Sequence, residues 1–368
     1  MKVVVTGAGG FIGRNLCSFL ERLEDVEVKR VLSSTPSDQF RHSIKEADII
    51  YHLAGVNRPK HSNEFITGNT HFTKEILEIA AEGDSVPTFV LSSTTQAHHD
   101  NEYGKSKRAA ELLVEQFASK GKINGAIYRL PGVFGKWSRP NYNSVVSTFC
   151  YNVANEIPLD VRDPNFSFPL VYIDDVIRAF SSHLNTRFNG LSNFEVTPVF
   201  RTTLGELSKI ISSFPSLKKS LYAPKVGDTL SKRLYSTYLS YLPIDKFSYP
   251  LELKKDNRGD LFEWIKSEDF GQIFVSTTKP GITRGNHFHH TKTEKFLVIR
   301  GEAEIALRQI DSDNIITYNV TGSEPTVVDI PTGYTHNITN SGETELITLF
   351  WANEIFDIEL PDTYYLKV

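Results

Sequence analysis

The secondary-structure pattern of the chain changes about two thirds of the way along, and this change restricts the fold more than any other feature. Before about residue 215, apolar strand-like runs alternate with helix-like stretches, which is typical of a parallel α/β sheet. After about residue 270, short β-rich runs follow one another with Gly, Pro and Asn turns, as in a small antiparallel sandwich or barrel. The pattern breaks at Tyr241–Tyr249, so we expect one domain over residues 1–243 and a second over residues 244–368.

The apolar runs give the expected strands of both domains. In the first domain these are Val3–Thr6, Val26–Leu32, Asp48–Leu53, Thr88–Ser93 and Asn124–Leu130. In the second they are Phe274–Thr278, Lys295–Ile299, Ala303–Gln309, Thr326–Ile330 and Glu345–Trp351. The predicted fold class is therefore α/β, a doubly wound parallel sheet, followed by an all-β domain.

Composition and charge exclude several classes of protein. The 368 residues are 40% hydrophobic and 23% charged, as in ordinary globular proteins. No apolar run approaches the roughly 20 residues of a membrane span, and no apolar leader precedes the first strand. Cys17 and Cys150 support neither a disulfide framework nor a cysteine zinc site. A net charge of −4 disfavours nucleic-acid binding. From these features together we expect a cytoplasmic enzyme or binding protein of two domains, with no nucleic-acid or membrane partner.

Charge and histidine are unevenly divided along the chain. Residues 245–368 contain 12 Lys and Arg against 20 Asp and Glu, a net charge of −8, which leaves +4 for the rest. A mildly positive first domain suits an anionic ligand such as a nucleotide. After His183 the only histidines are His287, His289, His290 and His336, which fall into two short segments.

A glycine-rich turn joins the first strand to the first helix. The strand Val3–Val5 is followed by Gly7, Gly10 and Gly13 and then by the helix-like stretch Arg14–Leu23. A tight turn, a close approach of the backbone to pyrophosphate and a helix N-terminus each favour glycine, so this junction predicts a dinucleotide site. The expected cofactor-binding residues are Gly7, Gly10, Phe11, Ile12, Gly13, Arg14, Ser33, Ser34, Leu53, Ala54 and Gly55.

The end of the second strand indicates which nicotinamide cofactor is bound. NAD sites usually place Asp or Glu there to contact the ribose hydroxyls, whereas this chain has Ser33–Thr35. These serines, with Arg14 and Arg30 nearby, suit a 2′-phosphate, so we expect NADPH. The alternative is that Asp38 turns toward the ribose, or that the serines are ordinary loop residues.

Tyr103 and Lys107 form a candidate acid–base pair. They are four residues apart in a helix-like stretch and therefore share one helix face. Because a tyrosine pKa is about 10, tyrosine is a poor acid–base group at neutral pH unless a cation favours tyrosinate, and Lys107 supplies that cation. Thr94, after the fourth strand, can hydrogen-bond the substrate oxygen.

These motifs together resemble an extended short-chain dehydrogenase/reductase over residues 1–243. The resemblance rests on the glycine turn, H-L-A-G at 52–55, S-S-T at 92–94 and Y-x-x-x-K at 103–107. It implies a Rossmann-like fold, Tyr103 as proton donor, Lys107 on the nicotinamide ribose and Thr94 orienting the carbonyl, and it adds Tyr103 and Lys107 to the expected cofactor-binding residues. This chain departs from the family in the short interval from Thr94 to Tyr103, and in Thr where Ser is commoner. Family members that act on nucleotide sugars bind the nucleotide in a smaller lobe, where the candidates here are Arg139, Arg162, Arg201 and Arg233.

Histidine and carboxylate residues of the second domain are spaced like metal ligands. His287 and His289 share one face of an extended segment, and Glu294 and His336 can come from neighbouring strands. Such a donor set suits Zn, Fe, Mn or Ni and leaves a position open for water or substrate. We expect one divalent metal, with zinc preferred, and His290 as a reserve ligand or a catalytic base.

The spacing of these residues and of the surrounding glycines resembles both motifs of the cupin family, except that Pro325 stands at the first glycine of the second motif. A reductase fused to a C-terminal cupin barrel resembles bifunctional enzymes of capsular polysaccharide precursor synthesis. These act on a UDP-linked 4-keto-6-deoxy amino sugar. The resemblance implies that the cupin epimerises C3 of a UDP-2-acetamido-2,6-dideoxy-4-hexulose. The reductase would then reduce C4 with NADPH to UDP-2-acetamido-2,6-dideoxy-L-talose, on the route to UDP-N-acetyl-L-fucosamine. Because both families commonly dimerise, we expect a homodimer.

Two other interpretations remain open. A 4-keto nucleotide-sugar reductase with a single activity would use its cupin only for dimerisation or ligand binding, and the isolated cupin would then exchange no hydrogen at C3. A non-catalytic redox sensor would bind NADP(H) without turnover, which the intact Tyr103 and Lys107 pair disfavours.

Overall fold

The chain folds into two compact units, and the computed structural model describes residues 1–368. The first unit contains Met1–Phe214 and Gly227–Pro243, and the second contains Pro215–Val226 and Ile244–Val368. No helix combines the length and the apolar character that a membrane crossing requires. The predicted order of an α/β part followed by an all-β part is confirmed.

The first unit is built on a six-stranded parallel sheet. Its strands are β1 (Lys2–Thr6), β2 (Glu27–Val31), β3 (Ile49–His52), β4 (Thr88–Thr94), β5 (Asn124–Leu130) and β8 (Leu191–Phe194). They lie in the order β2-β1-β3-β4-β5-β8, and every neighbouring pair is parallel. The five strands that the apolar runs predict are all present, and β8 extends the sheet.

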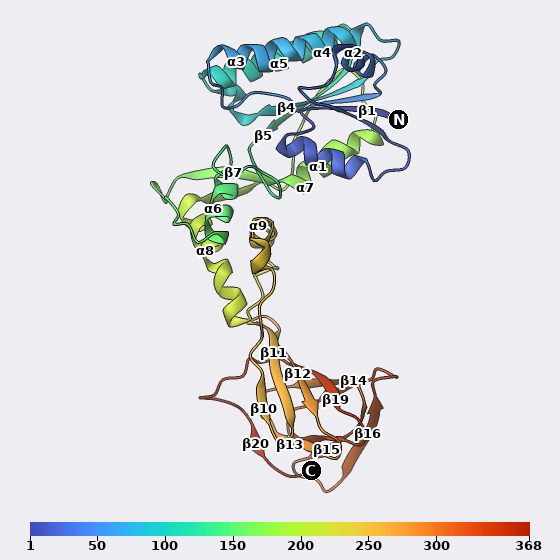
Figure 1. Cartoon of the computed structure of the whole chain (residues 1–368), viewed down its shortest axis with the longest axis vertical. Coiled ribbons are helices and arrows are strands. Elements are labelled where there is room, and N and C mark those ends of the chain that lie inside the picture. Colours follow the sequence, from blue (N-terminus) through green and yellow to red (C-terminus); the bar gives the residue numbers. More distant parts are fainter. The chain divides into compact units, whose positions relative to one another are not determined.

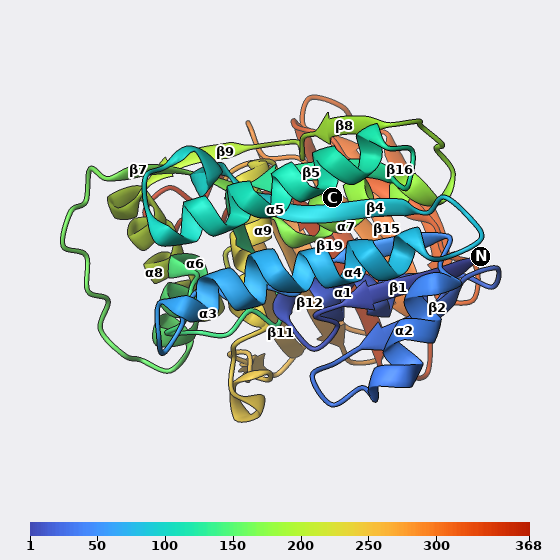
Figure 2. The same cartoon turned by 90° about the horizontal axis from the view of Figure 1, so that it is seen from above.

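Helices cover both faces of this sheet because its buried side chains alternate between two cores. Val3 and Val5 face one core and Val4 faces the other, as the two-residue period of a strand requires. Figure 1 shows one helical layer on each face, and in Figure 2 the helices α4 and α5 run side by side. The first layer contains α2 (Ser37–Lys45), α3 (Asn63–Phe65), η1 (Ile66–His71), α4 (Phe72–Ala81) and α5 (Glu102–Ser119), and the second contains α1 (Phe11–Leu20) and α7 (Ile173–Ser181).

A smaller lobe follows the sheet. Its strands β6 (Gly132–Phe134), β7 (Ser167–Tyr172) and β9 (Phe200–Thr203) form a separate sheet, and its helices are α6 (Val145–Ala154), α8 (Leu204–Ser220) and α9 (Thr229–Leu239). A buried ion pair holds α9 against α7, because Arg233 Nη1 lies 2.7 Å from Asp175 Oδ2. Short helical turns complete the unit at η2 (Thr95–His98) and η3 (Ser182–Leu184).

His52, at the end of β3, is a buried histidine that makes the first unit sensitive to acid. Its ring nitrogens lie 2.8 Å from Thr6 Oγ1 and 2.9 Å from Thr73 Oγ1, and burial lowers its pKa from 6.5 to about 3. Below pH 6.5 the unfolded chain takes up a proton at this site and the folded chain does not, so stability falls with pH. We expect His52 to contribute about 2 kcal/mol to the fall in the free energy of unfolding of the first unit from pH 7 to pH 5, measured by urea unfolding with far-ultraviolet circular dichroism.

The variant His52→Asn removes this titration. We expect this variant to lose about 2 kcal/mol less of its free energy of unfolding between pH 7 and pH 5 than the wild-type protein does, whatever its stability at pH 7. His42→Asn is the matched control, because the His42 side chain is 71% exposed, and it keeps the wild-type dependence. An unaltered pH dependence in His52→Asn would contradict the prediction.

The second unit consists of two antiparallel sheets that face each other. Their core contains Phe296 and Phe350 from one sheet and Ile305 and Ile338 from the other. The sheet orders are β10-β11-β12-β19-β14-β17 and β16-β15-β18-β13-β20. The strands are β10 (Lys254–Asp256), β11 (Gly259–Ser267), β12 (Gly271–Thr278), β13 (Thr283–Phe288), β14 (Glu294–Arg300), β15 (Glu302–Gln309), β16 (Ile315–Thr321), β17 (Val327–Ile330), β18 (Tyr334–Asn340), β19 (Leu346–Ala352) and β20 (Tyr364–Tyr365), and η4 (Ile244–Lys246) precedes them.

The five strands predicted here are present, but the apolar runs missed others, among them β13 and β18. Their sequences, T-R-G-N-H-F and Y-T-H-N-I-T-N, are polar because they carry site residues instead of an apolar core face. This polarity conceals the alternation that identifies a strand.

The structure also differs from the expected boundary at residues 243 and 244, which assigned Pro215–Val226 to the first domain. Pro215 lies inside α8 and has no backbone N–H to donate to the preceding turn of the helix. The chain that follows this helix pairs with β11. Lys266 N donates to Leu221 O at 2.8 Å, and Ala223 N donates to Lys266 O at 2.7 Å. These contacts place the segment in the second unit.

Candidate functional site

The glycine-rich turn lies where the strand order of the first sheet reverses. Because β1 is flanked by β2 and β3, the carboxyl ends of β1 and β3 form the switch point at which open α/β sheets bind ligands. Gly7 has a φ of +66°, and a Cβ there would lie 2.7 Å from Ala54 N. A Cβ on Gly13 would lie 2.2 Å from Gly7 O. Both positions therefore require glycine, and the turn brings the N-terminus of α1 close to the loop after β3.

The loop after β3 also meets the helix that carries the candidate acid–base pair. A Cβ on Gly55 would lie 2.8 Å from Asn69 Oδ1 and 3.8 Å from Lys107 Nζ. Asn69 is buried, accepts a hydrogen bond from Val56 N at 2.7 Å and donates one to Ser106 Oγ at 2.9 Å. The expected cofactor residues at 53–55 and the expected catalytic helix are thus brought together.

The residues expected to select the cofactor are only partly free to do so. Ser33–Ser34 lie in an exposed turn after β2, and Arg14 is exposed on α1. Arg30, in contrast, pairs with Glu21 at 2.6 Å. Asp38 is exposed in the first turn of α2. The serines and Arg14 therefore remain the candidates for contacting a 2′-phosphate.

Thr94, Tyr103 and Lys107 come together at the carboxyl end of β4. Thr94 ends that strand, and its hydroxyl accepts a hydrogen bond from Gln96 N at 3.2 Å. It also lies close enough to Tyr103, in the first turn of α5, to lower the pKa of that tyrosine. One turn later on the same face, Lys107 Nζ donates to Ser92 O at 2.6 Å. Thr94 and Lys107 are both buried. This arrangement can hold a substrate oxygen next to a proton donor and a cation.

Burial shifts the two titratable groups toward their neutral forms. It raises the pKa of Tyr103, and the nearby Thr94 hydroxyl opposes that shift. It lowers the pKa of Lys107 to about 8, and the charge of Glu111 opposes that shift. An anionic ligand beside Lys107 would favour the ammonium form, because an opposite charge favours ionisation.

The short interval from Thr94 to Tyr103 is accommodated by tight packing. The chain leaves β4 through the 3₁₀ turn η2, and Asn101 Oδ1 caps α5 by accepting from Gly104 N at 2.7 Å. A Cβ on Gly104 would lie 2.3 Å from Gln96 O. Because Gly104 lacks that atom, α5 can begin directly against η2.

In the second unit His287, His289, Glu294 and His336 form one compact group. Their ligand atoms all lie within 4.8 Å of one another. His287 on β13 is opposite His336 on β18, and Glu294 enters from β14 in the facing sheet. Glu294 Oε2 lies 3.4 Å from His289 Nε2 and 3.2 Å from His336 Nε2.

The hydrogen bonding of this group suits a metal ion. Both Nε2 atoms, of His289 and His336, are buried without a hydrogen-bond partner. Their Nδ1 atoms instead contact the carbonyl oxygens of Asp362 and Tyr334, the arrangement that fixes the tautomer of a metal ligand. Burial lowers the pKa of His287 to about 4, which keeps its imidazole neutral. Three imidazoles and one carboxylate with unpartnered nitrogens are the donors that zinc or a similar divalent metal uses.

Both units match known protein families. Residues 3–196 match the NAD dependent epimerase/dehydratase family, and residues 254–364 match the Polysaccharide biosynthesis C-terminal domain. The crystal structure of the capsular polysaccharide assembling protein CapF from Staphylococcus aureus covers 100% of both chains, with 44% identity and a TM-score of 0.93. The chain belongs to the CapF family. The resemblance to enzymes of capsular polysaccharide synthesis, which the motifs predicted, is thereby confirmed.

Two further comparisons describe relatives of this CapF family member. UDP-2-acetamido-2,6-beta-L-arabino-hexul-4-ose reductase of Pseudomonas aeruginosa is 42% identical over 369 residues, which cover 100% of this chain and 99% of the relative. A UDP-glucuronic acid 4-epimerase from Bacillus cereus, solved with UDP-glucuronic acid and NAD, is 20% identical over 66% of this chain and 99% of that one, with a TM-score of 0.56. The second likeness shows the fold alone.

His290 lies apart from the other histidines. It is exposed, and its ring contacts those of Phe288 and Tyr364, with centroids 5.2 and 4.9 Å away. The alternation of side chains along an extended segment turns it away from His287 and His289. The structure does not place it in the four-residue group, so it is not a ligand in this conformation.

Of the four candidate arginines in this CapF family member, the structure already pairs two. Arg233 lies in the buried pair with Asp175, and Arg162 binds Asp160 at 3.0 Å. Arg139 lies over an aromatic ring, and Arg201 is exposed. The last two remain the candidates for a nucleotide contact.

The sequence analysis missed a buried charge cluster behind the reductase residues. Glu111 contacts Arg129 Nη2 at 2.7 Å, Arg108 Nη1 at 2.8 Å and Ser93 Oγ at 2.5 Å. Burial alone would raise its pKa, but these hydrogen bonds outweigh it and lower the pKa. The available signal was spacing, since Glu111 follows Lys107 by four residues on α5.

Proposed function

We propose that this chain is a bifunctional enzyme acting on a UDP-linked 2-acetamido-2,6-dideoxy-4-hexulose. The second unit epimerises C3, and the first unit then reduces C4 with NADPH to give UDP-2-acetamido-2,6-dideoxy-L-talose. Full-length similarity to the P. aeruginosa reductase, whose name specifies a hexul-4-ose, supports the substrate class. The observation that carries the proposal is that one chain holds both the Thr94–Tyr103–Lys107 arrangement and a separate group of three histidines and a glutamate.

For the reduction, the chain's own residues handle the proton. Thr94 hydrogen-bonds the C4 oxygen, and Tyr103 transfers its hydroxyl proton to that oxygen as the carbonyl becomes an alcohol. The ammonium of Lys107 stabilises the tyrosinate left behind. The turn at residues 7–13 and Ser33–Ser34 would hold NADPH, which would supply the hydride for C4.

For the epimerisation, the ketone at C4 makes the C3 hydrogen acidic, so a base can remove it and the proton can return to the other face. His287, His289, Glu294 and His336 would hold a divalent metal, which we propose to be zinc. When bound, the metal stabilises negative charge on the substrate oxygen. Reduction of C4 then removes the ketone and prevents reversal at C3.

The test is an NMR experiment in deuterated water with the UDP-linked 4-keto-6-deoxy amino sugar. Without NADPH we expect deuterium to enter at C3 while the ketone persists. With NADPH we expect the ketone signal to disappear and the talo product to form. Failure to reduce C4 contradicts the proposal as a whole. Reduction without exchange at C3 instead supports a reductase with a single activity.

A further inference from the structure

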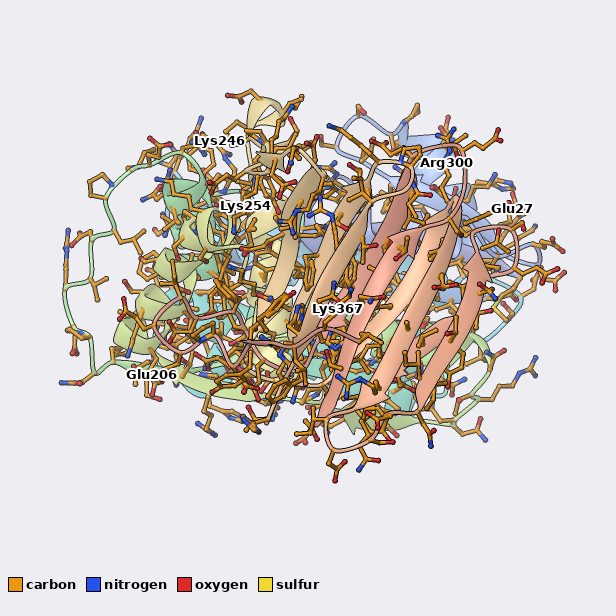
Figure 3. All side chains as sticks on the ribbon, turned by 90° about the horizontal axis from the view of Figure 1, so that it is seen from below. Glu27, Glu206, Lys246, Lys254, Arg300 and Lys367 are labelled. Atoms are coloured by element: carbon orange, nitrogen blue, oxygen red, sulfur yellow. The ribbon has the colours of Figure 1, made fainter.

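The last eight residues of the chain, 361–368, lie along β13, which carries His287 and leads into His289, and we call them the C-terminal strap. In the strap, β20 pairs with β13 so that Tyr365 is opposite His287. Leu366 N donates to Asn286 O at 3.0 Å, and Arg308 Nη2 donates to Lys367 O at 2.7 Å. Figure 3, in which Lys367 is labelled, shows this end of the chain crossing the strands of the second unit.

Asp362 is the strap residue that hydrogen-bonds a side chain of the four-residue group. Its backbone carbonyl accepts a hydrogen bond from His289 Nδ1. That contact puts the proton on Nδ1 and leaves the lone pair on Nε2, which faces Glu294 Oε2 at 3.4 Å. The strap therefore determines both the tautomer and the direction of the His289 ring.

The Asp362 side chain fixes the position of this carbonyl. Its carboxylate accepts hydrogen bonds from the backbone N of His290 at 3.0 Å and of Thr291 and Lys292 at 2.9 Å each. It also accepts one from Thr291 Oγ1 at 3.1 Å. Four donors on one carboxylate tie the strap to the turn immediately after His289.

Lys292 strengthens the same junction from the opposite side. Its side chain is 6% exposed, and its ammonium donates to Pro361 O at 2.9 Å and to Thr363 Oγ1 at 3.3 Å. Hydrogen bonds to the residues on both sides of Asp362 leave it little freedom to move. Together with the four donors on the Asp362 carboxylate, these two bonds restrain the strap next to His289.

We propose that the C-terminal strap is a structural part of the metal site and that Asp362 is a positioning residue for His289. Metal affinity at the four-residue group then depends on a side chain that contacts no metal. This inference rests on the proposed function, because it requires that the group binds a divalent metal.

The test is Zn²⁺ affinity of the full chain, measured by competition with a coloured chelator. We expect Asp362→Ala to weaken Zn²⁺ binding at least about tenfold, since outer-shell partners are worth 10- to 100-fold in metal affinity. The visible spectrum of bound Co²⁺ should change with the ligand geometry. Asp357→Ala is the matched control, because Asp357 lies in the same terminal segment and its carboxylate accepts only from Glu359 N nearby, at 2.9 Å. We expect wild-type affinity and spectrum from it.

A strap with only a structural role would lower the urea midpoint of Asp362→Ala and leave Zn²⁺ affinity and the Co²⁺ spectrum at wild-type values, which would overturn the inference. If Asp362→Ala does not fold, Asp362→Asn replaces it, because it keeps one of the two oxygens and should show a smaller loss of affinity. Wild-type affinity in Asp362→Asn would then overturn the inference. If the wild-type protein binds no Zn²⁺, the proposed zinc site is contradicted, and the inference about Asp362 is contradicted with it.

Discussion

Tyr103→Phe is expected to lower reduction of the 4-keto sugar by at least about 100-fold and to leave hydrogen exchange at C3 unchanged, because a positioned general acid is worth about 10²- to 10⁴-fold. The variant removes only the hydroxyl that Thr94 contacts, and it leaves the Lys107 hydrogen bond to Ser92 O in place. NADPH oxidation followed by absorbance measures the reduction, and NMR in deuterated water measures the exchange.

The control for this variant removes a tyrosine hydroxyl elsewhere. Tyr318, on β16 of the second unit, is 44% exposed, so Tyr318→Phe is expected to keep both activities. NADPH binding, measured by its fluorescence, verifies that Tyr103→Phe retains the cofactor site. Loss of both reduction and C3 exchange in Tyr103→Phe would mean that the two reactions are divided incorrectly between the units.

The sequence predicted most directly those parts of each site whose members are close together in the chain, and it predicted the distant ligand His336 only through the spacing of a family motif. Tyr103 and Lys107 share a face of α5 because of the helical repeat, and His287 and His289 share a face because side chains alternate along an extended segment. The central strands of the parallel sheet, such as β1 and β3, followed from apolar runs, which strands buried on both faces require, whereas the exposed edge strand β2 was found by alternation. In each of these local cases the prediction rested on residues that are close in the sequence, through the helical repeat, the two-residue repeat of a strand or an apolar run.

Residues that reach a site from a distant segment left no such signal. Asn69 meets Gly55 from η1, and Asp362 reaches His289 from 73 positions away. Asn69 binds the backbone of Val56 and the side chain of Ser106, and Asp362 binds the ring of His289. Single hydrogen bonds of this kind produce no repeating pattern in the sequence. The assignment of Pro215–Val226 to the second unit likewise depends on backbone hydrogen bonds, which almost any side chain allows.

His336→Ala is expected to abolish both metal binding and C3 exchange, while C4 reduction continues on a substrate already inverted at C3. His336 Nε2 is buried without a hydrogen-bond partner, 3.2 Å from Glu294 Oε2, so its loss removes one of the two imidazoles facing that carboxylate. We expect metal affinity to fall by more than about 100-fold, beyond the 10- to 100-fold effect of an outer-shell partner. Elemental analysis of the purified protein and NMR in deuterated water measure the two losses.

The companion variant His290→Ala tests the remaining role of His290, which is exposed and lies outside the four-residue group. Full metal content with wild-type exchange would exclude His290 both as a ligand and as the base. Full metal content without exchange would identify it as the base, and loss of metal would make it a reserve ligand. If His336→Ala itself keeps both metal and exchange, the metal-assisted epimerase hypothesis is wrong, because a metal site that has lost a buried imidazole cannot retain its affinity.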